Sequence, residues 1–480
     1  MASVRSAIIY SSLAKLSIQI IALASTMIVS RLLTPSEIGT YAVASSVVMI
    51  MSEFRLLGAG GYLIRESTIT REKVSSALGL TILVSWGLGF LILFLSYPVS
   101  IFYELESLRY IFLILSISFF FAPFLSIPIS LLTRELEFRF QLKVSLVGAV
   151  FGSALTIILI YLDFSFYSLA IGQVSSIVLQ AMIMALAKPR FMTYRPIFRN
   201  IKDVANFGIL NSLSNLFRKA NSTVPDLVIG KMGSTTEVSM LSRGRGLILF
   251  VQQTLTMGIS PVVLPFLSKT KKEGGDVAAA YTRASVMLGS LVVPVLGVVS
   301  LASLPTMRLF FGTQWDFAAS LVPWLAIAAM FRCIHAFSND LMIAESREKL
   351  MVIKDGALFI LLLVGLILAQ PLGLQVVASV FLILGVVDFI MITFILKRII
   401  KFSLVGFLKE WSKNILTLVI CVITTWYIGK HVPFTTPEYW KPVLAISLIL
   451  PPIWFFCLLI TRHPLAGELL SLAKRQHFSD

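Results

Sequence analysis

The sequence predicts an all-α protein that crosses a membrane many times. Of its 480 residues, 57% are hydrophobic and only 13% are charged, whereas about 25% of the residues of a soluble globular protein carry a charge. The mean hydropathy is +0.90. Apolar segments long enough for a spanning helix of roughly 20 residues recur along the whole chain. The expected class is therefore a polytopic membrane protein.

The apolar segments are separated by short breaks that contain charged residues, proline or glycine. No soluble domain fits between them, because the longest breaks run to about fifteen residues. The first segment is expected to remain as a helix although "ALA" at 22–24 resembles a signal-peptide cleavage site, because Lys15 lies in its middle. We place the spanning segments at 7–30, 37–60, 76–99, 108–132, 142–162, 166–187, 204–229, 237–267, 281–304, 318–343, 351–371, 374–396, 411–429 and 441–461.

The basic residues predict the orientation of the chain. The formal net charge is +16, and Lys and Arg gather in the breaks on one side, as in "KPRFMTYRPIFRNIKD" at 188–203 and "KRIIK" at 397–401. Short cytoplasmic loops carry this excess in helical membrane proteins. Both termini are therefore expected in the cytoplasm. The same distribution removes the main support for nucleic-acid binding, and no aromatic and basic interleaving typical of a strand-binding groove is found.

One turn occurs twice, 200 residues apart. "SRLLTPSEIGTYAVA" at 30–44 and "GKMGSTTEVSMLSRG" at 230–244 both join two apolar segments, and Glu37 aligns with Glu237. At the same offset the first and seventh segments share a polar stripe at helical spacing. The stripe consists of Ser11, Lys15, Gln19, Ala22 and Thr26 in the first segment and of Asn211, Asn215, Lys219, Ser222 and Asp226 in the seventh.

This repeat predicts two pseudo-symmetric lobes of six helices, at 1–200 and 201–400, each turning one polar helix toward a shared midline. The twelve-helix core is followed at 401–480 by an amphipathic linker, two further spanning helices and a cytoplasmic tail. The stretch "KRIIKFSLVGFLKEW" at 397–411 is amphipathic and is expected to lie along the membrane surface.

Charges inside the apolar segments are the main functional clue. A Lys or Arg near the middle of a membrane costs a few kcal/mol or more, so it should face the protein interior or a water-filled cavity. A cavity with net positive charge should attract an anion, and the Arg guanidinium matches the paired oxygens of phosphate. The cations are Lys15, Arg55, Arg218, Lys219, Arg243, Arg245 and Arg332, against the acids Glu53, Asp226 and Asp388.

Several of these assignments have a structural alternative. Arg243 and Arg245 can reach outward to the interface, and Glu53 and Arg55 can neutralise neighbouring charges. Arg218 and Lys219 are adjacent and cannot share one helix face, so that the spacing favours Lys219. Polar lining is expected from Gln19, Asn211, Asn215, His335 and Asn339, the last two lying on one helix face with Arg332, although such residues also bond neighbouring helices.

Asp388 lies in an otherwise apolar segment, and Asp226 lies on the polar stripe. Asp388 is either a paired or protonated structural carboxylate or a coupling site for a proton or sodium ion, and Asp226 is the other candidate. The three cysteines have no metal-ligand spacing, and no HExxH, GxSxG, GxxxxGK[ST] or GxGxxG motif occurs. We therefore predict no metal, no cofactor and no catalytic residues, and an enzyme is the less favoured interpretation.

The residues at 30–44, the Gly-rich "LLGAGGYLIRE" at 56–66 and the twelve-plus-two helix pattern resemble the polysaccharide transporter (Wzx-type oligosaccharide flippase) family. That family belongs to the multidrug/oligosaccharidyl-lipid/polysaccharide exporter superfamily. The resemblance covers roughly residues 1–400.

The resemblance implies a flippase of the bacterial inner membrane. It would move undecaprenyl-diphosphate-linked oligosaccharides for O-antigen, capsule or exopolysaccharide synthesis by alternating access of two lobes around a cationic cavity. Expected partners are the polyprenyl-diphosphate oligosaccharide, membrane lipid, a glycan polymerase and a chain-length regulator. A drug or cation exporter of the same superfamily and a membrane enzyme of glycan assembly remain open alternatives.

Overall fold

The computed structural model describes residues 4–55, 59–187, 189, 191–198, 209–257, 259–400 and 402–476; side chains at 4–15, 55, 209–215, 260–261 and 471–476 fall outside the description. Every regular element in these ranges is a helix. By their packing the helices form two units, Met1–Ser239 and Met240–Asp480. The all-helical class predicted from composition is therefore confirmed for the described residues.

Nine of the described helices are long and apolar enough to cross a membrane, or up to eleven if each of two bent helix pairs counts as one span. The chain is thus a multi-span membrane protein. The number is below the fourteen segments expected from the sequence partly because α10 (Ile209–Met232) and α11 (Thr235–Thr256) carry many polar and charged residues. The fourteen-span topology stays a prediction.

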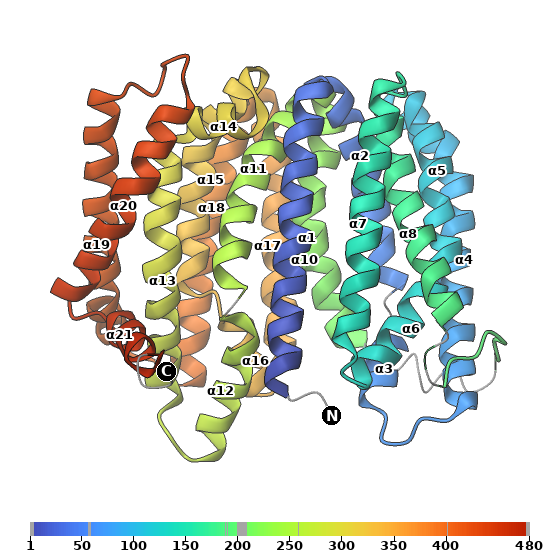
Figure 1. Cartoon of the computed structure of the whole chain (residues 1–480), viewed down its shortest axis with the longest axis horizontal. Coiled ribbons are helices and arrows are strands. Elements are labelled where there is room, and N and C mark those ends of the chain that lie inside the picture. Colours follow the sequence, from blue (N-terminus) through green and yellow to red (C-terminus); the bar gives the residue numbers. More distant parts are fainter. Residues whose placement is uncertain are drawn as a thin grey trace. The chain divides into compact units, whose positions relative to one another are not determined.

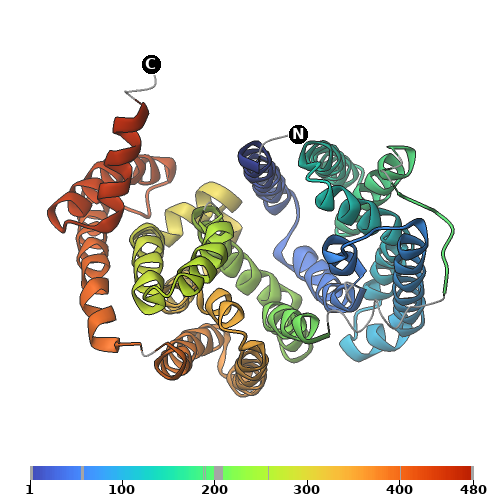
Figure 2. The same ribbon diagram turned by 90° about the horizontal axis from the view of Figure 1, so that it is seen from below.

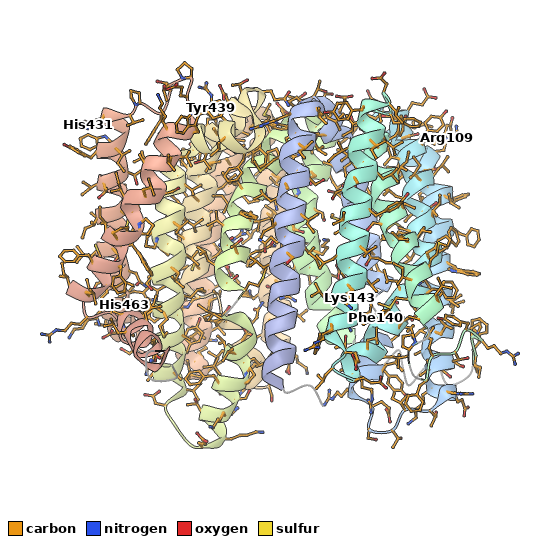
Figure 3. All side chains as sticks on the ribbon, in the orientation of Figure 1. Arg109, Phe140, Lys143, His431, Tyr439 and His463 are labelled. Atoms are coloured by element: carbon orange, nitrogen blue, oxygen red, sulfur yellow. The ribbon has the colours of Figure 1, made fainter. Side chains whose placement is uncertain are left out.

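Unit 1 is a bundle of helices, most of them long (Figure 1). Within it α7 packs against α1 and α8, α4 packs against α5, and α10 packs against α2. Arg109 near the start of α5 and Lys143 near the start of α7 lie toward opposite ends of this bundle in Figure 3. Besides α10, the helices of unit 1 are α1 (Val4–Leu32), α2 (Pro35–Arg55), α3 (Ala59–Arg65), α4 (Arg71–Tyr103), α5 (Ser107–Phe121), α6 (Pro123–Arg134), α7 (Phe138–Tyr161) and α8 (Tyr167–Ala187).

Unit 2 begins at Met240, within α11, and takes up the rest of the chain. Within it α15 packs against α13 and α18, α13 packs against α19, and α19 packs against α20, as the end-on view in Figure 2 shows. Its elements after α11 are α12 (Ser260–Lys272), α13 (Val277–Leu301), α14 (Ser303–Phe311), η1 (Thr313–Trp315), α15 (Asp316–Ile334), α16 (Ser338–Ala344), α17 (Glu348–Ala369), η2 (Gln370–Leu372), α18 (Leu374–Ile399), α19 (Leu404–His431), α20 (Trp440–Ile460) and α21 (Pro464–Gln476).

Three segments expected as single helices are each divided in two, at α5/α6, α11/α12 and α15/α16. The cause is clearest between α5 and α6, which meet at a bend of 43°. Pro123 has no N–H, so the Phe119 carbonyl loses its helical donor. Ser85 Oγ of α4 donates to that carbonyl at 2.6 Å, and Trp86 Nε1 donates to the Phe120 carbonyl at 3.1 Å. Two side chains of α4 therefore supply hydrogen-bond donors to the carbonyls that the break leaves without a helical partner.

The break between α15 and α16 in unit 2 is stabilised in the same way, by a serine from a neighbouring helix. Ser285 Oγ of α13 donates to the carbonyl of Ile334, the last residue of α15. Ser85 and Ser285 are both fully buried and lie 200 residues apart. The offset first found in the turn sequence thus continues into the packing of both units.

Replacing Ser285 with alanine is expected to lower the free energy of unfolding by about 1–3 kcal/mol, because the Ile334 carbonyl loses its donor and the Trp411 indole N–H loses its acceptor. Ser290→Ala is the matched control. Ser290 is also fully buried on α13, but among the described residues its hydroxyl bonds to the Met287 carbonyl of its own helix and to no other helix. Thermal unfolding of the purified variants in detergent measures both, and equal melting temperatures for the two would contradict the role given to Ser285.

The C-terminal region differs from expectation at one point. Residues 404–411, expected as part of a surface-lying linker, form the first two turns of α19, because the Ser403 hydroxyl caps the helix through the Gly406 N–H and Phe407 and Trp411 are buried.

The short helix near the C-terminus is α21. His463 Nδ1 accepts from the Leu465 N–H at its start, at 3.2 Å. Burial lowers the pKa of His463 to about 4, so the imidazole remains a neutral acceptor at neutral pH. In Figure 3 His463, beside α21, and His431, at the end of α19, lie toward opposite ends of unit 2.

Candidate functional site

The repeated turn is a pair of matching helix caps. In the first copy, the Thr34 N–H donates to Glu37 Oε2 at 2.8 Å and the Glu37 N–H donates to Thr34 Oγ1 at 3.3 Å. In the second, the Ser234 N–H and Glu237 Oε2 are 3.2 Å apart, as are the Glu237 N–H and Ser234 Oγ. Each is a reciprocal capping box that begins a helix, α2 or α11. The aligned glutamates therefore do the same structural work.

Unit 1 brings the two turns into contact. Ser36 Oγ lies 2.9 Å from Thr235 Oγ1, and α10 packs along α2 below them. A Cβ added at Gly39 would lie 1.7 Å from the Thr235 carbonyl oxygen. The close approach of α2 to the start of α11 therefore requires glycine at this position. The sequence repeat indicated two similar turns but not that they touch.

Polar contacts continue along α10. Ser46 Oγ of α2 donates to Asp226 Oδ2 at 3.0 Å, and both residues are buried. Tyr103 OH donates to the Leu227 carbonyl at 3.3 Å, and Lys231 Nζ lies 3.0 Å from Glu104 Oε1. Asp226, one of the two candidate coupling residues, is thus held at a helix–helix contact inside unit 1.

Other candidates of unit 1 are only partly described. Lys219 is half-buried and Arg218 is exposed, as expected if Lys219 lies on the polar stripe. Gln19 is half-buried on α1. The side chains of Lys15, Arg55, Asn211 and Asn215 lie outside the described residues, so their roles stay predictions.

Two arginines of α11 lie on aromatic rings in unit 2. The Arg243 guanidinium carbon is 5.2 Å from the Trp315 ring centroid and 5.6 Å from that of Phe311. Arg245 lies 5.1 Å from the Phe381 ring. Cation–π contact offsets part of the desolvation cost of a guanidinium and leaves its N–H edge to other groups. Arg243 Nε is buried and has no acceptor among the described residues.

Arg332, His335 and Asn339 do not share one helix face, which corrects the prediction. α15 ends at Ile334 and α16 begins at Ser338, because the helix breaks where Ser285 binds the Ile334 carbonyl. Arg332 is exposed, whereas His335 is buried and Asn339 is half-buried.

His335 is bonded on both sides of its ring. Its Nδ1 lies 3.0 Å from Tyr281 OH, and its Nε2 lies 3.0 Å from Thr393 Oγ1. The Thr393 hydroxyl donates to the Phe389 carbonyl, so Thr393 accepts from Nε2–H and Nδ1 accepts from Tyr281. The ring also stacks on Phe389 and Phe407. These contacts join α13, α18 and α19 around His335.

A buried charge cluster in unit 2 was missed at the sequence level. Lys354 Nζ of α17 lies 2.8 Å from Asp355 Oδ1 and 3.9 Å from Asp388 Oδ1 of α18. The three side chains are only 7%, 5% and 13% exposed. The sequence contains a pattern that could have revealed this cluster, since Lys354 and Asp355 lie inside the apolar segment 351–371. Because they are near the start of that segment, they are absent from the intramembrane charges named above.

The described residues include no group of three His, Cys, Asp or Glu placed to hold a metal ion. Unit 2 contains cations that have a carboxylate partner and cations that have none among the described residues. Lys354 is paired with carboxylates, whereas Arg243 and Arg332 have no hydrogen-bonded carboxylate among the described residues. Cations of the second kind can bind an anion without first giving up an ion pair.

Comparison with known proteins shows similarity to proteins of polysaccharide synthesis. The teichuronic acid biosynthesis protein TuaB of Bacillus subtilis (strain 168) is 24% identical over 419 residues, which cover 85% of this chain and 85% of TuaB. The succinoglycan biosynthesis transport protein ExoT of Rhizobium meliloti (strain 1021) is 22% identical over 309 residues, which cover 63% of this chain and 61% of ExoT.

Solved structures show the fold. The lipid II flippase MurJ in its inward closed conformation matches with a TM-score of 0.78 at 17% identity, over 95% of this chain and 99% of MurJ. An inward-facing MATE multidrug transporter of the MOP superfamily matches with a TM-score of 0.57 at 14% identity, over 82% of this chain and 99% of the transporter.

The family itself follows from the sequence. The profile of the family described as "Polysaccharide biosynthesis protein" matches residues 28–320, more than half of the chain. The chain therefore belongs to the polysaccharide biosynthesis protein family, with the fold of MurJ and the MATE transporters.

Proposed function

We propose that this protein is a flippase that translocates undecaprenyl-diphosphate-linked oligosaccharide units across the bacterial inner membrane for O-antigen, capsule or exopolysaccharide synthesis. In this proposal residues 1–200 and 201–400 form two six-helix lobes around a cationic cavity, and two further spanning helices follow. The lobes alternate access between the two sides of the membrane, and both termini are cytoplasmic. A glycan polymerase and a chain-length regulator act next on the product.

One observation carries the proposal: Arg243 and Arg332 lie in an apolar helical bundle without a hydrogen-bonded carboxylate among the described residues. A cation in such a position is costly to hold, and it is therefore by default a candidate for a functional role. The diphosphate of a lipid-linked glycan is a dianion whose oxygens match guanidinium geometry. The name of ExoT, a biosynthesis transport protein, supports a transport role for this relative.

In the proposed cycle, the glycan headgroup enters from the cytoplasmic leaflet while the prenyl tail stays in lipid. Lys15, Lys219 and Arg332 bind the diphosphate, and polar residues such as Gln19 and Asn215 bond sugar hydroxyls. Release on the outer side requires a conformation that binds the headgroup less tightly. A proton or sodium ion at Asp388 or Asp226 would bias that change.

A drug or cation exporter is the second candidate, because MATE transporters share the fold. Because its substrate is positively charged, such a transporter should have intramembrane carboxylates without a partner in preference to intramembrane cations without a partner. In the described part of unit 2, Arg243 and Arg332 are cations without a hydrogen-bonded carboxylate, whereas Asp388 has the Lys354 ammonium 3.9 Å away. A membrane enzyme of glycan assembly remains the third candidate.

Reversing two of the proposed cavity charges tests the function in cells. The double variant Lys219→Glu, Arg332→Glu is expected to abolish surface glycan, because each glutamate repels the diphosphate where a cation attracted it. Glycan is measured at the cell surface, and membrane levels of the protein by immunoblot. Normal glycan in cells that hold the double variant at wild-type level would remove the anion-binding claim.

A further inference from the structure

Asp388 lies among a set of charged and titratable groups from every helix packed around it. Its closest neighbours are Lys354 and Asp355 of α17. The charges of Lys354, Arg332 and Asp355 act on its carboxylate, and the charges of Asp388 and Asp340 both act on the Tyr281 phenol. The set consists of Tyr281 on α13, Arg332 on α15, His335 after it, Asp340 on α16, and Lys354 and Asp355 on α17.

Lys354 does not satisfy both carboxylates. Its Nζ is at hydrogen-bond distance from Asp355 Oδ1, at 2.8 Å, but 3.9 Å from Asp388 Oδ1, beyond the range of a hydrogen bond. Asp388 Oδ1 is buried and has no donor among the described residues. With two carboxylates and one ammonium, the buried trio carries a net charge of −1 when all are ionised. An uncompensated charge at this depth is unfavourable.

Arg332 supplies the missing positive charge. It projects from the last turn of α15, which packs along α18. Its side chain is exposed, and no described residue forms a hydrogen bond or ion pair with it. Phe331, the residue before Arg332, lies against Phe389, the residue after Asp388, with ring centroids 6.1 Å apart. The Arg332 charge is therefore near enough to act on Asp388, while its guanidinium can bind an anion.

We propose that Asp388 takes up a proton from water when an anionic diphosphate binds Arg332, so that substrate binding and proton binding favour each other. The bound anion neutralises the guanidinium, and the Lys354–Asp355–Asp388 trio then regains neutrality by protonation of Asp388 Oδ1. The inference rests on the proposed function and assigns its coupling ion. Since linkage is reciprocal, the diphosphate binds more tightly when Asp388 is protonated, and loss of that proton favours release.

The same geometry argues against a metal ion here. Two neighbouring carboxylates are ordinary ligands for a hard cation, which takes six or more oxygen ligands. Between Asp355 and Asp388, however, the space is held by the Lys354 ammonium. Lys354 therefore serves as a fixed counter-cation, and the exchangeable charge is the proton.

The test is equilibrium binding to the purified full chain in lipid nanodiscs. The probe is a short-chain prenyl diphosphate carrying one hexose, because a diphosphate diester does not itself titrate near neutral pH. Wild-type affinity is expected to rise on acidification between about pH 8 and pH 5, by up to about tenfold per pH unit for one linked proton. Replacing sodium by potassium at constant ionic strength is expected to leave the affinity unchanged.

Asp388→Asn is expected to bind the probe with an affinity independent of pH. Asp316→Asn is the matched control, because Asp316 is paired with Arg308 at the start of α15 and its loss should leave the pH dependence intact. Should Asp388→Asn prove unstable, infrared difference spectra of the wild type supply a second readout, in which probe binding should increase the band of a protonated carboxyl group.

The possible results distinguish a failure of the proton assignment from a failure of the flippase proposal. Probe binding with the same pH dependence in wild type and Asp388→Asn, or a sodium-dependent affinity, would overturn the proton assignment and leave the flippase proposal standing. Failure of the wild type to bind the probe at any pH would overturn both.

Discussion

Gly39→Val is expected to reduce transport to below a tenth of the wild-type rate. A Cβ at this position would lie 1.7 Å from the Thr235 carbonyl oxygen and 2.4 Å from its carbon, so the start of α11 must move away from α2. Overpacking of this kind costs about 1–3 kcal/mol or more. The displacement also breaks the Ser36–Thr235 contact and strains the Ser46–Asp226 bond.

Transport in proteoliposomes and thermal unfolding measure this effect. Gly87→Val is the matched control, because a Cβ at Gly87 in α4 meets nothing within 4 Å. The control is expected to keep both activity and melting temperature. If Gly39→Val behaves like Gly87→Val, the close contact between the two repeated turns does not matter to the protein.

Replacing Lys15, Lys219 and Arg332 together with alanine is expected to lower the flipping rate at least about 100-fold. A hydrogen bond to a charged group contributes about 1.5–3 kcal/mol, so the loss of two such bonds already corresponds to about two orders of magnitude.

The control for this variant removes three exposed cations. Arg109, Lys143 and Lys397 are exposed at or near helix ends, two of them labelled in Figure 3. Their replacement by alanine is expected to leave flipping unchanged. Equal losses in the two triple variants would point to a general effect of charge on folding or insertion and not to a binding site.

The fold class was predictable because the bilayer sets the length and polarity of every segment. The positions of the helix breaks were not, since a break such as that at Pro123 depends on a donor from another helix, here Ser85. Pro98 and Pro294, by contrast, lie inside the unbroken helices α4 and α13. Proline alone therefore does not mark a break in this chain.

For the candidate site, the residue types could be predicted from the sequence, but the contacts that these residues make could not. Composition and spacing identified Arg243 and Arg332 as intramembrane cations, and the structure places both in unit 2 without a hydrogen-bonded carboxylate among the described residues. The aromatic contacts of Arg243 come from residues about 70 positions away, which no spacing rule connects. The Lys354–Asp388 pairing likewise depends on the packing of α17 against α18. His335, predicted from its spacing to Arg332, lies instead in a buried network with Tyr281 and Thr393.

The most direct test of the proposed function is flipping of a fluorescent polyprenyl-diphosphate oligosaccharide by the purified protein in proteoliposomes. The native protein is expected to move the probe between leaflets, and the Lys15, Lys219 and Arg332 triple alanine variant is expected not to. No flipping by the native protein, with a probe taken from the glycan that the cell makes, would contradict the flippase proposal.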